Sequence, residues 1–503
     1  MGLSKLAVRI GELYQNYRGN TNDLLPLIPQ LRAEFPKLPP GREAIETIGL
    51  YCDHPRHGGV LRTVSLQSEL LVSVGYRVVI LAPFPLEDFP FEIPEKCTFL
   101  PLGNVDEPSK EDFSLVVHDL ERAISDYDID LIVTHSWWTR FSLFAYIAIT
   151  SLPVRSVLTC HNFCLYGMVG QANSIFDIRA IASGFDAVTV LSETDLAFWQ
   201  LAGLPNVHYL PNPLDFNYSI RTDNSAENYV CDLAWIGRLT EATKKISEVL
   251  EIFALVLQKR PSSTLHIYSP KAADSPEVLE LVALAESLNI TDHVRFCPPP
   301  NVAAALASAK VFIFTSIVEG FPYVLSEPLL VETPVVMYEL PYLEITKANP
   351  GIIAVPWGDR QAAADNVLSL LNDVQYRSTI GKVGRQFLQD NFNNDFVLAC
   401  FQKVVESLNH QRSASINDFS DIEPNIEYGD MTEIVRQLFP LYQAGLNRRM
   451  AQLNKKNATI NSLKQTLVER RDIIAAKDER IAKLELVVSQ QSQRISELTK
   501  EPR

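Results

Sequence analysis

Two glutamates, Glu319 and Glu327, stand eight residues apart directly after an apolar run that is typical of a buried strand. If the turn Gly320-Phe321-Pro322 opens a helix, a rise of about 1.5 Å per residue separates the two carboxylates by about 12 Å. That distance suits the sugar and the ribose of a nucleotide-sugar, whose phosphates would face the N–H groups after Gly320 at the helix N-terminus. Alone, such a pair is also typical of a solvated strand-to-helix turn.

Three basic side chains, Arg238, Lys244 and Lys245, follow a second apolar run that ends in Trp235 and Ile236. A guanidinium and an ammonium that converge on a diphosphate supply the positive charge that stabilises it as a leaving group. We predict Lys244 as the lysine that does so, with Lys245 in reserve. Without the preceding strand and Glu319, an ordinary basic surface turn would be the preferred interpretation.

Two further segments could approach a ligand. Gly58 and Gly59 follow a strand and precede a helix, and consecutive glycines permit a tight turn and a close approach of the backbone. His161 ends another predicted strand, where an imidazole can hydrogen-bond a sugar hydroxyl or a developing charge. His135 has a similar place and ranks below His161. A generic turn and a structural histidine are the alternatives.

Metal binding is disfavoured. Asp128 and Asp130 form an Asp-x-Asp pair, but they lie at the entrance of a strand, where acidic residues commonly begin the element. Cys160 and Cys164 flank His161 without a second pair of ligands that could complete a tetrahedral zinc site. We therefore expect neither a metal nor any other cofactor.

These segments together resemble the retaining GT-B glycosyltransferases, specifically glycosyltransferase family 4, over residues of about 45–410. The resemblance implies that Glu319 holds hydroxyls of the donor sugar, that Glu327 holds the ribose, and that Arg238 and Lys244 hold the diphosphate. His161 would contact the sugar. It also implies that the anomeric configuration of the sugar is retained, through attack on the front face of the sugar that the leaving phosphate assists.

The sequence departs from the family pattern at two positions near Glu327. Pro328 follows it directly, which predicts a helix that begins later, with Ser326 as its cap. Glu332 stands where the family has a glycine, which removes the easy left-handed end of that helix.

Short apolar runs alternate with amphipathic stretches along most of the chain, a pattern that favours parallel sheets covered by helices on both faces. We predict two Rossmann-like domains joined by a linker, with the cleft between them as the site. The predicted strands are 47–52, 77–82, 130–134, 155–160, 186–191 and 207–210 in the first domain, and 230–236, 264–268, 294–296, 311–315, 335–338 and 352–355 in the second.

The predicted divisions of the chain follow from these patterns. They are an N-terminal helical extension (1–44), an acceptor domain (45–216), a nucleotide-sugar domain (229–395), a crossover helix (396–412), a linker (413–445) and a coiled coil (446–500). Apolar residues recur every seven positions in the last part, at Leu446, Leu453, Ile460, Leu467, Ile474, Ile481, Val488 and Ile495. These residues would form the apolar seam of a coiled coil. We expect a homodimer or a partner protein at this seam, although charged residues such as Arg470 interrupt it.

Composition narrows the class of protein further. The 503 residues carry a net charge of −15, so no general attraction to nucleic acid or anionic lipid is expected. Seven scattered cysteines indicate reduced thiols and a cytoplasmic location, with a local membrane-docking patch left open.

We therefore expect a metal-independent hexosyltransferase that uses a nucleotide-sugar and an unidentified glycan, lipid-linked or protein acceptor. The turn at 338–346 faintly resembles enzymes that glycosylate wall or envelope polymers. The competing hypothesis is a non-catalytic GT-B scaffold that tethers a partner through the coiled coil. The enzyme is favoured because the sequence contains all four charged residues that are expected to contact the donor: Glu319, Glu327, Arg238 and Lys244.

Overall fold

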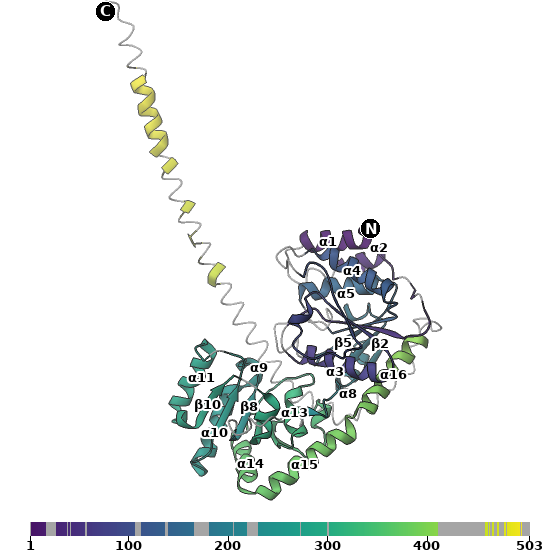
Figure 1. Ribbon diagram of the computed structural model, residues 1–503. Helices are drawn as coiled ribbons and strands as arrows, with labels where there is room; N and C mark the ends of the chain where they lie inside the picture. The colour runs from purple at the N-terminus through teal and green to yellow at the C-terminus, as the bar shows by residue number, and fades with distance from the viewer. Residues whose placement is uncertain are drawn as a thin grey trace, which may run out of the picture. The chain divides into compact units, whose positions relative to one another are not determined.

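The computed structural model divides into a large unit that ends at Ile434 and a C-terminal unit from Val435 (Figure 1). It describes residues 2–16, 27–37, 39–40, 42–55, 58–105, 112–135, 139–164, 181–204, 206–218, 230–271, 273–298 and 301–410, with scattered residues between 458 and 494. Within these residues, the large unit holds two parallel sheets covered by helices, as the sequence predicts.

The first sheet has the strand order β3-β2-β1-β4-β5-β6-β7, and every pairing is parallel. Its central strands are fully buried apolar runs, which is expected of a sheet covered on both faces. The strands are β1 (Thr47–Tyr51), β2 (Arg77–Ala82), β3 (Thr98–Pro101), β4 (Leu131–Thr134), β5 (Arg155–Cys160), β6 (Ala187–Val190) and β7 (Val207–Tyr209).

Helices form two layers on one face of this sheet. α4 (Phe113–Asp126) and α5 (Arg140–Ser151) are covered by α1 (Lys5–Asn16) and α2 (Leu27–Glu34) from the N-terminal extension. Tyr14 of α1 anchors that contact, because its ring stacks on Phe113 at 4.8 Å and meets Phe144 edge-on at 5.2 Å. The extension is thus part of the first domain's packing.

The other face is closed by two helices far apart in the sequence. α3 (Gly59–Ser73) and α16 (Asn394–His410) share one core cluster with the sheet, to which α16 contributes Val397, Phe401, Val404 and Leu408. Figure 1 shows α16 beside α3, after the chain has left the second domain. The described part of this domain also includes α8 (Glu193–Leu201).

The second sheet has the order β10-β9-β8-β11-β12-β13 and is also parallel. Its core packs under α10 and α14, while α13 contacts α12 and α15. The strands are β8 (Cys231–Ile236), β9 (Leu265–Tyr268), β10 (Val294–Cys297), β11 (Ala309–Phe314), β12 (Val335–Tyr338) and β13 (Ile352–Val355). The helices are α9 (Glu241–Lys244), α10 (Ile246–Lys259), α11 (Pro276–Ser287), α12 (Val302–Ala307), α13 (Tyr323–Leu330), α14 (Arg360–Asn372) and α15 (Val374–Asn391).

Two local predictions around Glu327 are wrong. Helix α13 begins at Tyr323 after Pro322 and contains Pro328, so Ser326 lies inside the helix and donates its hydroxyl to the carbonyl of Tyr323. Glu332 adopts the left-handed conformation itself, with φ of 62°, and ends the helix without a glycine. Tertiary packing holds Pro328 inside the helix and Glu332 in the left-handed conformation, each at a local energetic cost.

The predicted linker lies outside the described residues, as does most of the predicted coiled coil. None of the helices in the described parts of the chain is both long enough and apolar enough to cross a lipid bilayer.

Candidate active site

The turn from Glu319 to Pro322 joins β11 to the start of α13. The Glu319 amide donates to the Tyr342 hydroxyl at 2.9 Å, which fixes the turn to the segment after β12. Gly320 lies directly against the main chain of His161, because a Cβ placed there would be 2.1 Å from the His161 carbonyl oxygen. A side chain at this position would force the two segments apart.

The Glu319 carboxylate forms an ion pair with Lys244. Glu319 Oε1 lies 2.5 Å from Lys244 Nζ, and about one-seventh of each side chain is exposed. The Thr315 hydroxyl donates to the carbonyl of Lys244 at 2.7 Å, and so it ties the basic segment to the end of β11. The segments that follow the adjacent parallel strands β8 and β11 thereby bring together two groups that are 75 residues apart.

The other two predicted basic ligands lie differently. Lys245 adopts the left-handed conformation between α9 and α10, and its ammonium is 4.0 Å from Glu241. Arg238 is exposed, with no ion-pair partner among the residues that the structure describes. Lys244 is thus the lysine in contact with Glu319, and the guanidinium of Arg238 is accessible to a ligand.

Glu327 is buried in α13 and faces Arg62 of α3 in the first domain. Arg62 Nη1 lies 3.1 Å from Glu327 Oε1, and Arg62 Nη2 lies 3.9 Å from Asp215 Oδ2. The guanidinium is also 5.1 Å from the ring centre of Tyr218 and 5.5 Å from that of Tyr323. Sequence reasoning missed this pairing, although a lone arginine in an apolar stretch of α3 is a visible signal.

For both Glu327 and Arg62, burial and the charge of the partner shift the pKa in opposite directions. Burial raises the pKa of the Glu327 carboxyl, and Arg62 only partly offsets that effect. For Arg62, burial lowers the pKa, but the surrounding acidic groups outweigh it and the net direction is upward. Arg62 is therefore a permanent cation at the position where a ribose contact is expected.

His161 lies at the end of β5 and pairs with His135 at the end of β4. His135 Nδ1 and His161 Nε2 are 3.0 Å apart. Burial lowers the pKa of His161 to about 4, and burial together with His161 lowers that of His135. Both rings are therefore neutral near pH 7. One ring donates its N–H to the unprotonated nitrogen of the other.

An aromatic stack holds the His161 segment against the second domain. The Phe163 and Tyr342 rings lie 3.8 Å apart with an angle of 11° between their planes. Because Tyr342 also accepts the Glu319 amide, it connects the two predicted sugar contacts, Glu319 and His161. Neither aromatic residue was among the predicted site residues.

The glycine pair lies at the start of α3. Gly59 is the first helical residue, Gly58 precedes it, and a Cβ on Gly59 would lie 3.6 Å from the ring of Tyr323. The Thr63 hydroxyl is 3.1 Å from that of Tyr323, so the N-termini of α3 and α13 lie near each other (Figure 1). The predicted Phe321 is buried beside this contact.

The Asp-x-Asp pair has structural partners. Asp130 Oδ2 accepts from the amides of Glu46 and Thr47 at 2.9 and 3.0 Å. Asp128 lies 2.6 Å from Arg42. Both carboxylates thus fasten the start of β1 and β4 to neighbouring segments, at the opposite strand ends from Glu319 and His161.

Two family models match the chain, one for each sheet. Residues 57–218 match Glycosyltransferase Family 4, and residues 231–387 match Glycosyl transferases group 1. A capsular polysaccharide biosynthesis glycosyltransferase, CapM of Staphylococcus aureus, is 26% identical over 174 residues. The match spans 34% of this chain and 44% of CapM.

Solved structures share the fold at low sequence identity. TarM of Staphylococcus aureus has a TM-score of 0.58 at 12% identity, over 72% of this chain and all of TarM. Sucrose-phosphate synthase of Thermosynechococcus elongatus has a TM-score of 0.58 at 19% identity, over 72% of this chain and 99% of that structure. HepE of Anabaena has a TM-score of 0.54 at 16% identity, with the same coverage. The two family matches and the fold together place the chain among the GT-B glycosyltransferases.

Proposed function

We propose that the protein is a retaining, metal-independent hexosyltransferase that takes a sugar from a nucleotide diphosphate and transfers it to an acceptor bound by the first domain. The contact between Lys244 and Glu319 beside the N-terminus of α13 carries this proposal. It combines a carboxylate for sugar hydroxyls, a cation for the diphosphate and a helix end that favours anions.

Each residue has a defined chemical role in this proposal. Glu319 accepts hydrogen bonds from donor-sugar hydroxyls and orients Lys244. Lys244 and Arg238 neutralise the diphosphate as the glycosidic bond breaks, which is the charge compensation that a metal would otherwise provide. Lys245 is the nearby reserve cation. The amides that follow Gly320 add donors, while Glu327 holds the ribose once it is released from Arg62.

The relatives support a particular class of substrate. HepE was solved with UDP, and TarM with UDP and α-GlcNAc-glycerol. CapM acts in capsular polysaccharide biosynthesis. We therefore propose a uridine diphosphate-sugar as the first donor to test and a surface or envelope glycan as the product, made by an enzyme on the cytoplasmic side of the membrane.

Incubation of the purified full chain with a panel of UDP-, GDP-, ADP- and TDP-hexoses should identify one donor from which nucleoside diphosphate is released. Hydrolysis by water reveals the donor before the acceptor is known. A Glu319→Ala protein should lose this activity. No release from any donor, at protein concentrations where folding is verified, would reject the enzyme in favour of the scaffold hypothesis.

Chelation is expected to leave this activity intact. Lys244 and Arg238 supply positive charge, and Asp128 and Asp130 already have structural partners. The rate of donor hydrolysis should therefore be the same in excess EDTA and in magnesium or manganese. Loss of activity in EDTA that manganese restores would contradict metal independence.

Self-association through the C-terminal seam is a separate prediction. Three seam residues within the described part of the chain, Ile460, Ile481 and Val488, are 48%, 52% and 60% exposed. They are β-branched residues at heptad a positions, and leucine at apolar d positions such as Leu484 completes a combination that favours a parallel two-stranded coil. Light scattering should report a dimer for the full chain and a monomer after truncation at residue 412, with donor hydrolysis retained. A full chain that stays monomeric at tens of micromolar would leave a partner protein as the use of the seam.

A further inference from the structure

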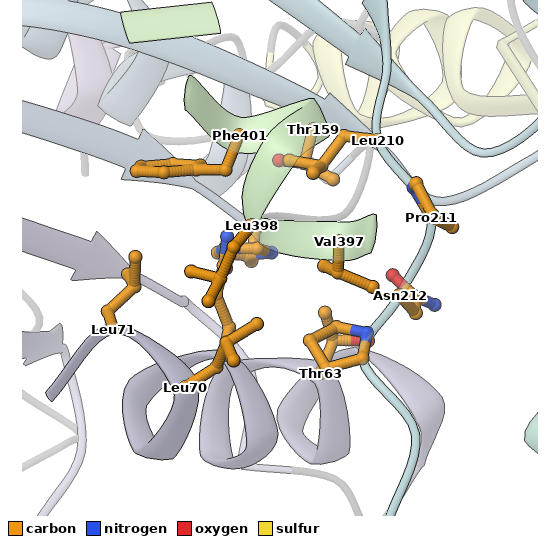
Figure 2. Close-up of a pocket in the computed structure, with 13 residues that line it drawn as sticks. Thr63, Leu70, Leu71, Thr159, Leu210, Pro211, Asn212, Val397, Leu398 and Phe401 are labelled. Carbon is orange, nitrogen blue, oxygen red and sulfur yellow. The ribbon is translucent and has the colours of Figure 1, made fainter. Parts of the chain in front are cut away.

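A small hollow lies inside the first domain, behind the His135–His161 pair. Figure 2 shows side chains of α3 and α16 facing it from opposite sides, with Thr63, Thr159 and Asn212 among its polar residues. Its free volume is about 10 Å³, which is room for about one water molecule. His135 and Gln67 also line it.

Two polar atoms at this hollow have no hydrogen-bond partner within the described residues. They are Nε2 of His135, whose residue is 1% exposed, and Oε1 of Gln67, whose residue is 5% exposed. A buried polar atom without a hydrogen-bond partner destabilises the folded state, so both atoms require a partner. Both residues line the hollow, which has room for one water molecule.

The other ring nitrogen of His135 reaches the candidate active site. Nδ1 lies 3.0 Å from Nε2 of His161, and the two ring planes are tilted by 39°. In a pair of neutral imidazoles, a single N–H joins the two rings, so the protonated nitrogen of one ring fixes the tautomer of the other. His161 Nδ1 is then left with a defined role, as donor or as acceptor.

We propose that His135 is a positioning residue that holds His161 in one ring orientation and one tautomer, with a water molecule in the hollow fixing His135 in turn. The proposal rests on the proposed function, in which His161 contacts the donor sugar. His135 touches no substrate. It acts because its hydrogen bond prevents His161 from rotating or exchanging tautomers between turnovers.

A set of variants in the full chain separates this role from simple packing. His135→Leu removes both ring nitrogens, whereas His135→Asn keeps a polar group near the position of Nδ1. On the donor found by the hydrolysis panel, His135→Leu should lower turnover by about tenfold to a hundredfold, the scale of losing a hydrogen-bonded partner that orients a functional side chain. His135→Asn should recover most of that loss, and thermal unfolding should verify that both proteins fold.

A double-mutant cycle with His161→Ala provides the decisive kinetic comparison. If His135 acts through His161, the double variant His135→Leu/His161→Ala should be no slower than His161→Ala alone. Equal factors for His135→Leu in both backgrounds would overturn the proposal, as would His135→Asn no faster than His135→Leu.

Nitrogen-15 NMR of the histidine side chains gives a readout that needs no substrate. His161 should show one tautomer in the unaltered protein and in His135→Asn, and averaged ring shifts in His135→Leu. Unchanged His161 shifts in His135→Leu would overturn the positioning role even if no donor is found. If the NMR result holds and His161→Ala retains full turnover, it is the sugar contact of His161, in the proposed function, that fails.

Discussion

Replacing Glu319 by alanine is expected to lower turnover by about a hundredfold or more, the loss seen when one preorganised transition-state contact is removed. In the proposed function, the substitution removes the acceptor for donor-sugar hydroxyls. It also leaves the Lys244 ammonium without the carboxylate that lies 2.5 Å away. Under that proposal, both losses act on the step in which the glycosidic bond breaks. The measurement is steady-state nucleoside diphosphate release from the identified donor.

Two comparisons make the Glu319 result specific. Glu286→Ala removes an exposed carboxylate from α11 of the same domain, and it should leave turnover unchanged. Lys244→Ala should lower turnover strongly, and the double variant should lose less than the product of the two single losses, because the side chains act as a pair. A Glu319→Ala enzyme with near-normal turnover would reject the donor-site assignment.

Gly320→Ala is expected to lower turnover by on the order of a hundredfold, the scale of a displacement of about 1 Å within an active site. The added Cβ would lie 2.1 Å from the His161 carbonyl oxygen and 3.3 Å from the Cα of Asn162. Because these neighbours are main-chain atoms, no side-chain rotation can relieve the conflict. The Glu319 turn and the His161 segment must therefore separate, which moves both predicted sugar contacts.

Gly11→Ala is the matched control for this steric effect. Its Cβ would lie 2.7 Å from the Cβ of Ser114, in the packing of α1 against α4. It should lower the thermal unfolding midpoint while kcat per folded molecule stays unchanged, because overpacking costs about 1–3 kcal/mol wherever it occurs. If Gly320→Ala also lowers only the unfolding midpoint, the close approach at Gly320 has no catalytic consequence.

Twelve of the described strands were predicted from the sequence, and the central ones are clearest because a covered parallel strand is a continuous apolar run. The unpredicted strand, β3 (Thr98–Pro101), is short, only partly buried and at the edge of its sheet, so its pattern is weak. The start of α13 was mispredicted for another reason. Pro328 has a strong local preference, and tertiary packing around α13 overrides it.

Within the candidate site, local patterns reveal only some of the contacts. Glu319 and Lys244 could be proposed together because each follows a strand of the same sheet. The pairing of Arg62 with Glu327 and the stack of Phe163 on Tyr342 join different domains. No periodicity or spacing within one segment encodes such contacts, so they require the folded chain.

The position of α16 has a consequence for how the protein is made. The first domain's core includes Val397, Phe401, Val404 and Leu408, but its last strand ends at Tyr209. At about 5–20 residues per second, the ribosome needs roughly 10 to 40 s to extend the chain from that strand to α16. During this interval α16 does not yet cover the apolar side of α3, while the second domain is synthesised and can fold. The first domain begun is therefore the last one completed.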